Sequence, residues 1–296
     1  MDGLTDAQLE EFQQNGCIVL YGELNKDQVQ AVLGRSHQLL NEFSVESHPM
    51  TRFTTGEQVG QSEHVGDDYF IGSSDKIRYF FEEDAFDKQG NLNRNKAAAV
   101  NKIGHALHEQ DPVFKSVSVT RRNRAIADSL GFKDPRILQS MVICKQPEIG
   151  GEVPTHQDGT FLYTEPLSAV GFWYALEDCT LENGCLEFVP GSHKTARVYK
   201  RFVRKMDDGP GTEFITLDGV DPYEEPTKEK FNVVACPAGS LVLIHNSVLH
   251  RSNRNTSGKS RYAYTFHVID GTCHYDSRNW LQVPPAGGTN FTELKV

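Results

Sequence analysis

Apolar residues near the amino terminus recur with the period of an α-helix. A shorter helix is predicted to begin at the capping box Thr5–Gln8 and to end at Gly16, and the β-prone run Cys17–Tyr21 follows it. A longer helix is predicted after Asn25, a residue type that favours helix N-caps. Its apolar or small residues form one stripe that would dock on a larger body: Val29, Val32, Leu33, Ser36, Leu40 and Phe43.

The next part of the chain mixes irregular and periodic segments. Residues 44–69 are polar and aperiodic, which is typical of a long functional loop. Ile77–Phe81 predicts a strand and Asp87–Gly90 predicts a turn. Residues 97–131 favour helices, and Asp111 followed by proline marks a helix start within them. We therefore expect residues 1–136 to form a mostly helical N-terminal layer.

Short β-rich runs separated by Gly, Pro and Asn dominate the chain from Ile137 onward. The runs cover residues 137–145, 170–176, 185–189, 231–235, 241–244 and 262–269. This texture favours a sandwich or barrel over alternating βαβ units. We predict a mainly β fold with N-terminal helices, in a single domain over residues 1–296. Its β core would cover residues 137–296, with an insert near residues 196–230.

Charge and composition exclude several classes of partner. The chain has 296 residues and a net charge of −10, which opposes the basic surface that nucleic-acid binding needs. The longest apolar stretch, Ala169–Leu176, is far shorter than the roughly 20 residues of a membrane helix. The six cysteines are scattered, as in a reducing compartment, and neither end resembles a targeting signal. We therefore expect a cytoplasmic protein that binds neither nucleic acid nor membrane.

A histidine and an aspartate two residues apart mark a candidate metal site. On a strand, His156 and Asp158 would point to one face and could chelate one ion. The same pattern recurs by chance at His274 and Asp276, but only the first copy is followed by further histidines, including His250. Two histidines and one carboxylate leave open positions on an octahedral metal, as in non-haem Fe(II) oxygenases. A closed structural zinc site requires a fourth protein ligand.

Ordered motifs in the second half of the chain resemble those of the phytanoyl-CoA dioxygenase family. These are His156-x-Asp158, then Asn183–Leu186 running into Pro190–His193, then His250-x-Ser252-x-x-Asn255-x-Ser257-x-x-x-Arg261. The likeness extends from the N-terminal helices through residues 75–82 and 101–108 to Trp280, and it is strongest to the short, leaderless branch of the family.

The resemblance implies a double-stranded β-helix, the cupin-like jelly roll, flanked by α-helices. It also implies Fe(II) held by His156, Asp158 and His250, with O₂ and 2-oxoglutarate as cosubstrates. Arg261 would grip a carboxylate of 2-oxoglutarate, although a surface arginine is the plain alternative. Further cosubstrate or metal-side contacts are implied for Lys102, Met141 and Trp173. The alternatives are that Lys102 is a solvated lysine on a helix, that Met141 is a core residue of a strand, and that Trp173 is a core aromatic residue.

The predicted function is that of a dioxygenase that hydroxylates a small or medium organic substrate and releases succinate and CO₂. The alternatives are a catalytically silent jelly roll that binds metal or ligand, and a zinc-dependent hydrolase. Halogenation is disfavoured because Asp158 keeps the carboxylate ligand.

The absent leader argues against an acyl-CoA substrate. A cluster of basic residues, Arg197, Lys200, Arg201, Arg204 and Lys205, could bind an anionic substrate or form a solvated face. No oligomeric state follows from the sequence.

Overall fold

The computed structural model describes residues 3–52, 68–205, 211–283 and 291–295. Helix α1 (Asp6–Asn15), strand β1 (Cys17–Leu20) and helix α2 (Lys26–Glu42) confirm the predicted order at the amino terminus. Thr5 and Asn25 form the capping boxes of the two helices, and Gly16 ends α1 with a positive φ of 78°. Val32, Ser36 and Leu40 of the predicted stripe are buried in α2.

The largest element is an eight-stranded sheet in the order β1-β11-β6-β13-β4-β3-β2, with β14 also paired to β4. All its pairings are antiparallel. Its strands beyond β1 are β2 (Ile77–Phe81), β3 (Val100–His105), β4 (Pro135–Lys145), β6 (Val170–Ala175), β11 (Leu241–His245), β13 (Arg261–Asp270) and β14 (Thr292–Glu293).

A smaller sheet completes the jelly roll. Its order is β10-β7-β12-β5, formed by β5 (Val153–His156), β7 (Leu186–Phe188), β10 (Asn232–Val234) and β12 (His250–Ser252). Apolar side chains of both sheets meet in one cluster that includes Trp173, Leu186 and Val242. The predicted mainly β, jelly-roll fold class with flanking helices is confirmed.

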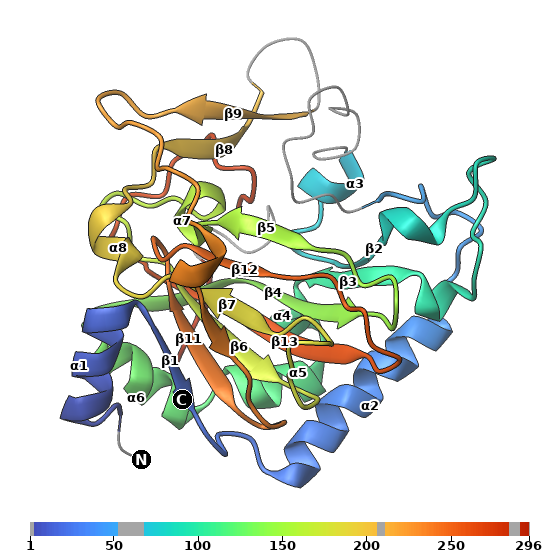
Figure 1. The fold of residues 1–296 in the computed structure, drawn as a ribbon, viewed down its shortest axis with the longest axis horizontal. Helices are drawn as coiled ribbons and strands as arrows, with labels where there is room; N and C mark the ends of the chain where they lie inside the picture. The colour runs from blue at the N-terminus through green and yellow to red at the C-terminus, as the bar shows by residue number, and fades with distance from the viewer. Residues whose placement is uncertain (1–2, 53–67, 206–210, 284–290, 296) are drawn as a thin grey trace.

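Short helices and one hairpin decorate the two sheets. The helices are α3 (Asp68–Ile71), α4 (Leu107–Gln110), α5 (Pro112–Ser118), α6 (Arg121–Ser129), α7 (Asp158–Phe161), α8 (Ser192–Thr195) and the 3₁₀ turns η1 (Glu83–Ala85), η2 (Lys96–Ala98) and η3 (Lys228–Lys230). The segment expected to be an insert forms the hairpin β8 (Lys200–Arg204) and β9 (Thr212–Thr216). This hairpin lies on the far side of the sandwich from α2 and α5 (Figure 1).

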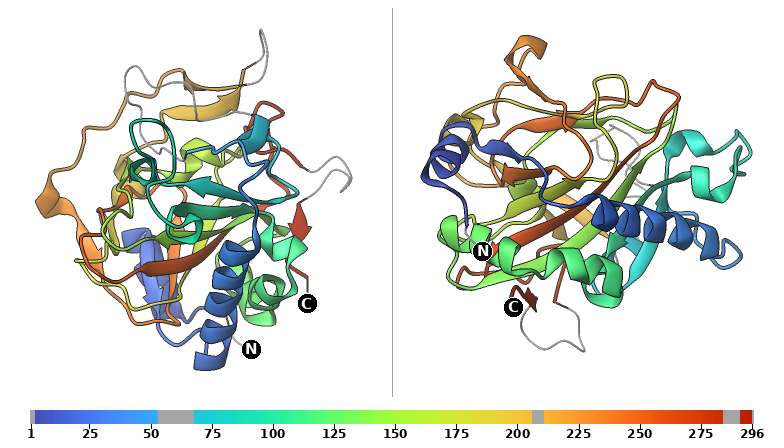
Figure 2. Two further views of the ribbon diagram at one scale, coloured as in Figure 1. Left: turned by 90° about the vertical axis from the view of Figure 1, so that its right-hand side faces the viewer. Right: turned by 90° about the horizontal axis from the view of Figure 1, so that it is seen from below.

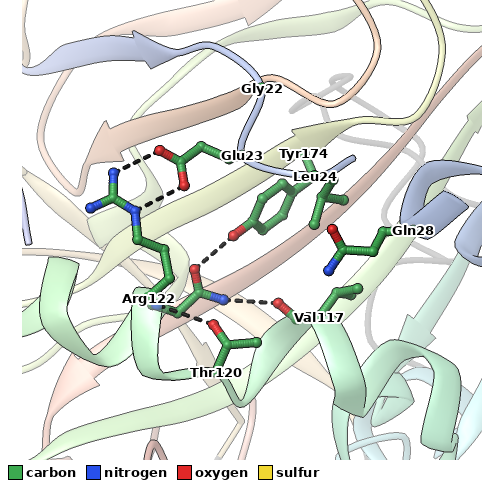
Figure 3. A pocket seen from close by; sticks show the side chains of 9 residues that line it. Gly22, Glu23, Leu24, Gln28, Val117, Thr120, Arg122 and Tyr174 are labelled. Carbon is green, nitrogen blue, oxygen red and sulfur yellow. Dashed lines mark hydrogen bonds and ion pairs between the residues drawn. The ribbon is translucent and has the colours of Figure 1, made fainter. Parts of the chain in front are cut away.

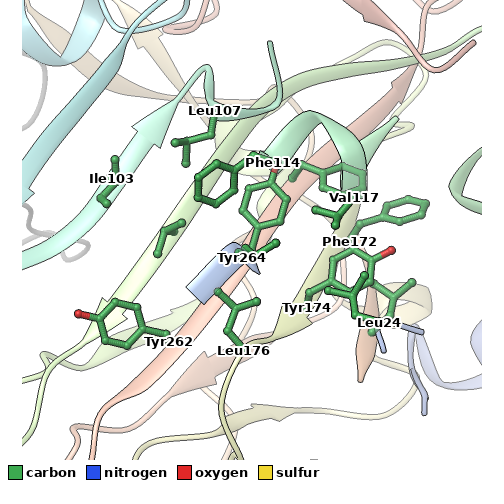
Figure 4. Packing of buried hydrophobic residues seen from close by; sticks show 14 of the residues in the cluster. Leu24, Ile103, Leu107, Phe114, Val117, Phe172, Tyr174, Leu176, Tyr262 and Tyr264 are labelled. Atoms are coloured by element: carbon green, nitrogen blue, oxygen red, sulfur yellow. The ribbon is translucent and has the colours of Figure 1, made fainter. Parts of the chain in front are cut away.

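Alternation along the central strands separates two functions of the main sheet. Tyr262, Tyr264 and Phe266 of β13 belong to the main hydrophobic cluster. Tyr262 and Tyr264 lie among its apolar residues in Figure 4, on the face of the sheet that the helices cover in Figure 2. Residues between them, such as Ala263 and Thr265, therefore face the smaller sheet. One face of the main sheet supplies the core, and the other is available for polar chemistry.

The structure confirms the prediction of helices over residues 97–131 from residue 107 onward, as α4, α5 and α6, and corrects it before that point. Residues 100–105 form β3, which pairs with β2 on one side and β4 on the other. Strands β1, β2 and β3 thus join the N-terminal part to the main sheet. Backbone pairing with two distant strands outweighs the local pattern that favoured a helix, because tertiary context routinely overrides propensity. Among the described residues, no helix combines the length and apolar character that crossing a membrane requires.

Acid should destabilise the protein partly through His108 on the helical side of the main sheet. The His108 ring is buried against Ser140 Oγ at 2.7 Å, and burial lowers its pKa from 6.5 to about 4. Between these pH values the unfolded chain binds a proton that the folded protein does not, so stability falls as pH falls. Protonation of this histidine should lower the free energy of unfolding by roughly 3 kcal/mol as the pH falls through this range. The free energy of unfolding, measured with urea across pH 4–8, should depend less steeply on pH in His108→Leu than in wild type. An equal dependence on pH would contradict this prediction.

Candidate functional site

Two histidines of the smaller sheet lie side by side and face the main sheet. His156 ends β5 and His250 begins β12, and the two are direct cross-strand partners. Their ring centroids are 4.1 Å apart. Directly opposite residues of an antiparallel pair share a face of the sheet, which explains why residues 94 positions apart in sequence converge.

Asp158 completes this cluster. Its Oδ1 lies 3.6 Å from His156 Nε2 and 3.6 Å from His250 Nε2. These separations are too long for hydrogen bonds. They fit two ligand atoms that each lie about 2.0–2.2 Å from one shared metal ion. Within the described part of the chain, these three residues form the one group whose geometry could hold a metal ion.

Both imidazoles are held with Nε2 toward Asp158. His156 Nδ1 donates to the carbonyl oxygen of Pro154 at 2.9 Å, and His250 Nδ1 donates to that of Val248 at 3.0 Å. Each ring therefore carries its proton on Nδ1 and leaves the Nε2 lone pair free for a metal. Burial lowers the pKa of His250 to about 4, helped by the neighbouring His156, so His250 is neutral at ordinary pH.

The position of Asp158 differs from the predicted one. It does not share a strand with His156 but begins α7, after Gln157. The Gln157 amide donates to the carbonyl oxygens of Ala196 and Ser247, so it anchors the turn. Burial opposes ionisation of Asp158, but His250 and His267 outweigh it and hold the carboxyl pKa well below its usual value. The cluster therefore carries an anionic ligand.

Arg261 begins β13 and is only 1% exposed, which excludes the surface alternative. Its guanidinium carbon lies 5.2 Å from the ring of Trp173, and Nη2 donates to Ser252 Oγ at 3.3 Å. Its Nε and Nη1 have no hydrogen-bond partner in the described structure. A buried guanidinium with two orphaned donor atoms is costly unless a ligand pairs with it.

Met141 and Lys102 lie on the same inner face of the main sheet. Cross-strand register places Met141 of β4 beside Thr265 of β13, which in turn lies beside Trp173 of β6. Lys102 lies on β3, not on a helix, and its ammonium group is about 5 Å from the ring centres of Phe70 and Phe80. Burial holds the pKa of Lys102 well below its usual value.

Two other predicted features are not part of the metal-ligand group of the described residues. His274 is exposed and bridges to Glu165 through the backbone, and it belongs to no ligand group among the described residues. In the basic cluster, Arg201 is buried and bonds to Asp276 and Asn279. Arg204 donates to the carbonyl oxygens of Trp280 and Ile71. These two arginines therefore brace the β8–β9 hairpin.

The sequence interpretation missed one residue of the site, His267. Its Nε2 lies 3.3 Å from Asp158 Oδ2, so it touches the candidate ligand set from the main sheet. The signal was the alternation along β13, which places His267 on the same face as Arg261.

A separate cavity of about 520 Å³ lies under the helical layer, on the other face of the main sheet. Glu23 pairs with Arg122, and Asn123 accepts from the Tyr174 hydroxyl and donates to the carbonyl oxygen of Val117 (Figure 3). These polar groups satisfy one another, so they form a structural network and do not resemble a catalytic cluster.

Comparisons with known proteins bear on the whole chain. The family described as Phytanoyl-CoA dioxygenase (PhyH) matches residues 12–263. Phytanoyl-CoA dioxygenase domain-containing protein 1 of Bos taurus is 46% identical over 288 residues, which cover 95% of this chain and 96% of that protein. A phytanoyl-CoA dioxygenase of Arabidopsis thaliana is 42% identical over 280 residues, 94% of each chain.

Solved structures share the fold at lower identity. EctD from S. alaskensis, crystallised with 2-oxoglutarate and 5-hydroxyectoine, has a TM-score of 0.61 and 18% identity, and covers 99% of this chain and 90% of its own. The epimerase SnoN, in complex with Fe³⁺, alpha ketoglutarate and nogalamycin RO, has a TM-score of 0.60 and 16% identity, with coverage of 99% and 97%.

Proposed function

The chain belongs to the phytanoyl-CoA dioxygenase family, and from that membership we propose that it is an Fe(II)- and 2-oxoglutarate-dependent dioxygenase. The proposed reaction hydroxylates a small or medium organic substrate and releases succinate and CO₂. The observation that carries this proposal is the convergence of His156 Nε2, His250 Nε2 and Asp158 Oδ1 within 4.8 Å of one another.

The donor set fits iron better than the alternatives. Two imidazoles and one carboxylate form the facial triad of non-haem Fe(II) oxygenases, which leaves three positions for other ligands. A catalytic zinc site can use the same donors, but it does not explain a buried, underpaired arginine near the triad. A silent protein that binds only metal would have no use for that arginine, whereas a silent protein that also binds a carboxylate ligand would use it and is separated from an enzyme by turnover.

Arg261 fits a carboxylate of 2-oxoglutarate. Its Nε and Nη1 lack partners, and either atom can pair with Nη2 in a planar fork that binds a carboxylate through two hydrogen bonds. Trp173 holds the guanidinium plane from one side. We assign Arg261 to the distal carboxylate, with Met141 and Trp173 lining the path toward the triad and Lys102 as a further contact.

The chain's own residues bind, orient and exclude water, because the demanding chemistry belongs to the cofactor. Iron bound at the triad would supply oxygen activation coupled to decarboxylation of 2-oxoglutarate. The carbonyl groups of Pro154 and Val248 fix the two imidazoles. Phe161 packs beside His156 with ring centroids 6.1 Å apart, so an apolar ring borders the triad at this histidine.

Purified protein loaded with Fe(II) under anaerobic conditions tests the proposal. On addition of O₂ and 2-oxoglutarate it should release succinate and CO₂, and a library of free metabolites should contain compounds that stimulate this release and are hydroxylated. Zinc-loaded protein should be inactive. Absence of any 2-oxoglutarate turnover with Fe(II) bound would favour the silent binding protein.

We predict that acyl-CoA thioesters are poor substrates in the same assay. Coenzyme A carries phosphates that need exposed cations. Arg201 and Arg204 are engaged within the protein, which leaves Arg197 and Lys205 as the exposed residues of the basic cluster. Long-chain acyl-CoA should therefore give less than about a tenth of the coupled hydroxylation seen with the best free metabolite, measured by mass spectrometry. Efficient hydroxylation of the thioester would contradict this.

A further inference from the structure

We propose that His267 is a positioning residue that holds one oxygen of Asp158 and so reserves the other oxygen for the metal ion. The inference rests on the proposed function, since it concerns how the triad is arranged. It assigns a role to a residue outside the triad, on the opposite sheet of the jelly roll.

The two oxygens of Asp158 have different neighbours. Oδ1 lies 3.6 Å from Nε2 of both His156 and His250, at a distance that a shared metal would span. Oδ2 lies 3.3 Å from His267 Nε2, within hydrogen-bond distance. The carboxylate is thus divided between a side that faces the ligand histidines and a side that faces β13.

The hydrogen-bond partners determine which nitrogen of His267 carries the proton. The side-chain Nε2 of Gln139 lies 3.4 Å from His267 Nδ1. An amide nitrogen can only donate, so His267 Nδ1 accepts this hydrogen bond and the ring N–H lies at Nε2. His267 Nε2 therefore donates to Asp158 Oδ2. The result is a directed chain from Gln139 of β4 through His267 of β13 to Asp158 of α7.

The neighbouring strand leaves room for this contact. Gly171 of β6 is the cross-strand partner of His267. A Cβ placed on Gly171 would lie 3.4 Å from both Asp158 Oδ2 and His267 Nε2. An alanine would already be in van der Waals contact with both atoms, and any longer side chain would intrude between them. His267 and Asp158 are buried, so water does not compete strongly for the hydrogen bond.

A held Oδ2 favours binding of Asp158 through Oδ1 alone. If both oxygens bound the metal, the carboxylate would occupy one of the three positions that a facial triad leaves for other ligands. With His267 in place, each triad residue has one partner that orients it: a backbone carbonyl for each histidine and an imidazole N–H for the aspartate. Such partners of metal ligands typically contribute 10- to 100-fold in metal affinity.

The test uses the full-length protein and Mn(II) alone as the probe. His267→Leu removes the donor with little change in volume, whereas His267→Gln keeps an amide N–H that can reach Asp158. His108→Leu is the matched control, because it removes a buried, hydrogen-bonded histidine from the other face of the main sheet. Mn(II) affinity is measured by calorimetry, the coordination environment by electron paramagnetic resonance, and the fold by circular dichroism.

We expect His267→Leu to weaken Mn(II) binding by about 10- to 100-fold and to change the resonance spectrum of the bound ion. His267→Gln should recover most of the affinity, to within about threefold of wild type, and the wild-type spectrum. His108→Leu should bind Mn(II) like wild type. A purely structural role for His267 would not produce rescue by glutamine together with an altered spectrum in the leucine variant.

The outcomes separate the two proposals. If Asp158→Ala loses Mn(II) binding while folded His267→Leu matches wild type in affinity and spectrum, the positioning role is wrong and the triad stands. The positioning role is also wrong if His267→Gln and His267→Leu weaken Mn(II) binding equally. If wild type and Asp158→Ala bind Mn(II) alike, the metal site itself is wrong and the proposed function fails with it.

Discussion

Replacing Asp158 by alanine should abolish iron retention and all 2-oxoglutarate turnover. Asp158 is the only anionic member of the triad, and His250 and His267 hold its pKa low, so the folded protein presents a carboxylate ready to bind. Two imidazoles alone would remain, and we expect the dissociation constant for Fe(II) to rise by at least about 100-fold. Metal content after desalting and succinate release together measure the effect.

The fold should survive this substitution. Asp158 lies at the end of the sandwich in a turn that Gln157 anchors independently, so circular dichroism of Asp158→Ala should match wild type. His274→Ala is the control, because His274 begins the second His-x-Asp pattern and lies outside any ligand group of the described residues. It should retain wild-type iron. Wild-type iron content in Asp158→Ala would refute the assignment of the triad.

Replacing Arg261 by alanine should sharply raise the concentration of 2-oxoglutarate that the enzyme requires. The guanidinium is buried beside Trp173 and keeps Nε and Nη1 for a ligand. Truncating one partner of a buried, hydrogen-bonded charge pair costs about 2–5 kcal/mol, which corresponds to roughly 30- to several-thousand-fold in affinity. Titration of the Fe(II)-loaded variant with 2-oxoglutarate gives the dissociation constant directly.

Iron binding should be nearly unchanged in Arg261→Ala, since Arg261 is not a member of the triad. Arg136→Ala is the matched control: Arg136 is a buried arginine of the main sheet that already pairs with Asp134 and Glu293. It should lose stability but keep wild-type affinity for 2-oxoglutarate. An unchanged dissociation constant in Arg261→Ala would show that another cation binds the cosubstrate, with Lys102 as the first residue to test.

Local patterns in the sequence were sufficient for elements whose signals are themselves local. The capping boxes at Thr5 and Asn25 predicted α1 and α2 because each cap uses residues within one helical turn. The β-rich run at residues 262–269 predicted β13, since alternation of side chains is a property of a single strand. The triad was also accessible, because His156-x-Asp158 and the later His250 stand in ordered motifs that resemble those of a known family.

Other features depended on contacts between distant parts of the chain. Residues 100–105 became a strand because β2 and β4 offer backbone partners on both sides, and no local pattern reports such partners. The basic cluster could bind an anion on sequence grounds, but Asp276 and Asn279 satisfy Arg201 from 75 or more residues away. Burial and partner choice are decided by the assembled fold.

The candidate site shows both kinds of information. The sequence by itself predicted a sandwich or barrel and a metal site at His156, Asp158 and His250, because residue type and spacing limit which chemistry is feasible. The jelly roll and the role of Arg261 toward 2-oxoglutarate were implied by the resemblance of its ordered motifs to one family. Only the tertiary structure decided that Asp158 begins a helix, that Arg261 is buried with two donor atoms lacking partners, and that His267 Nε2 lies within hydrogen-bond distance of Asp158 Oδ2. These facts depend on the register of two facing sheets, which is set by the packing of the whole core.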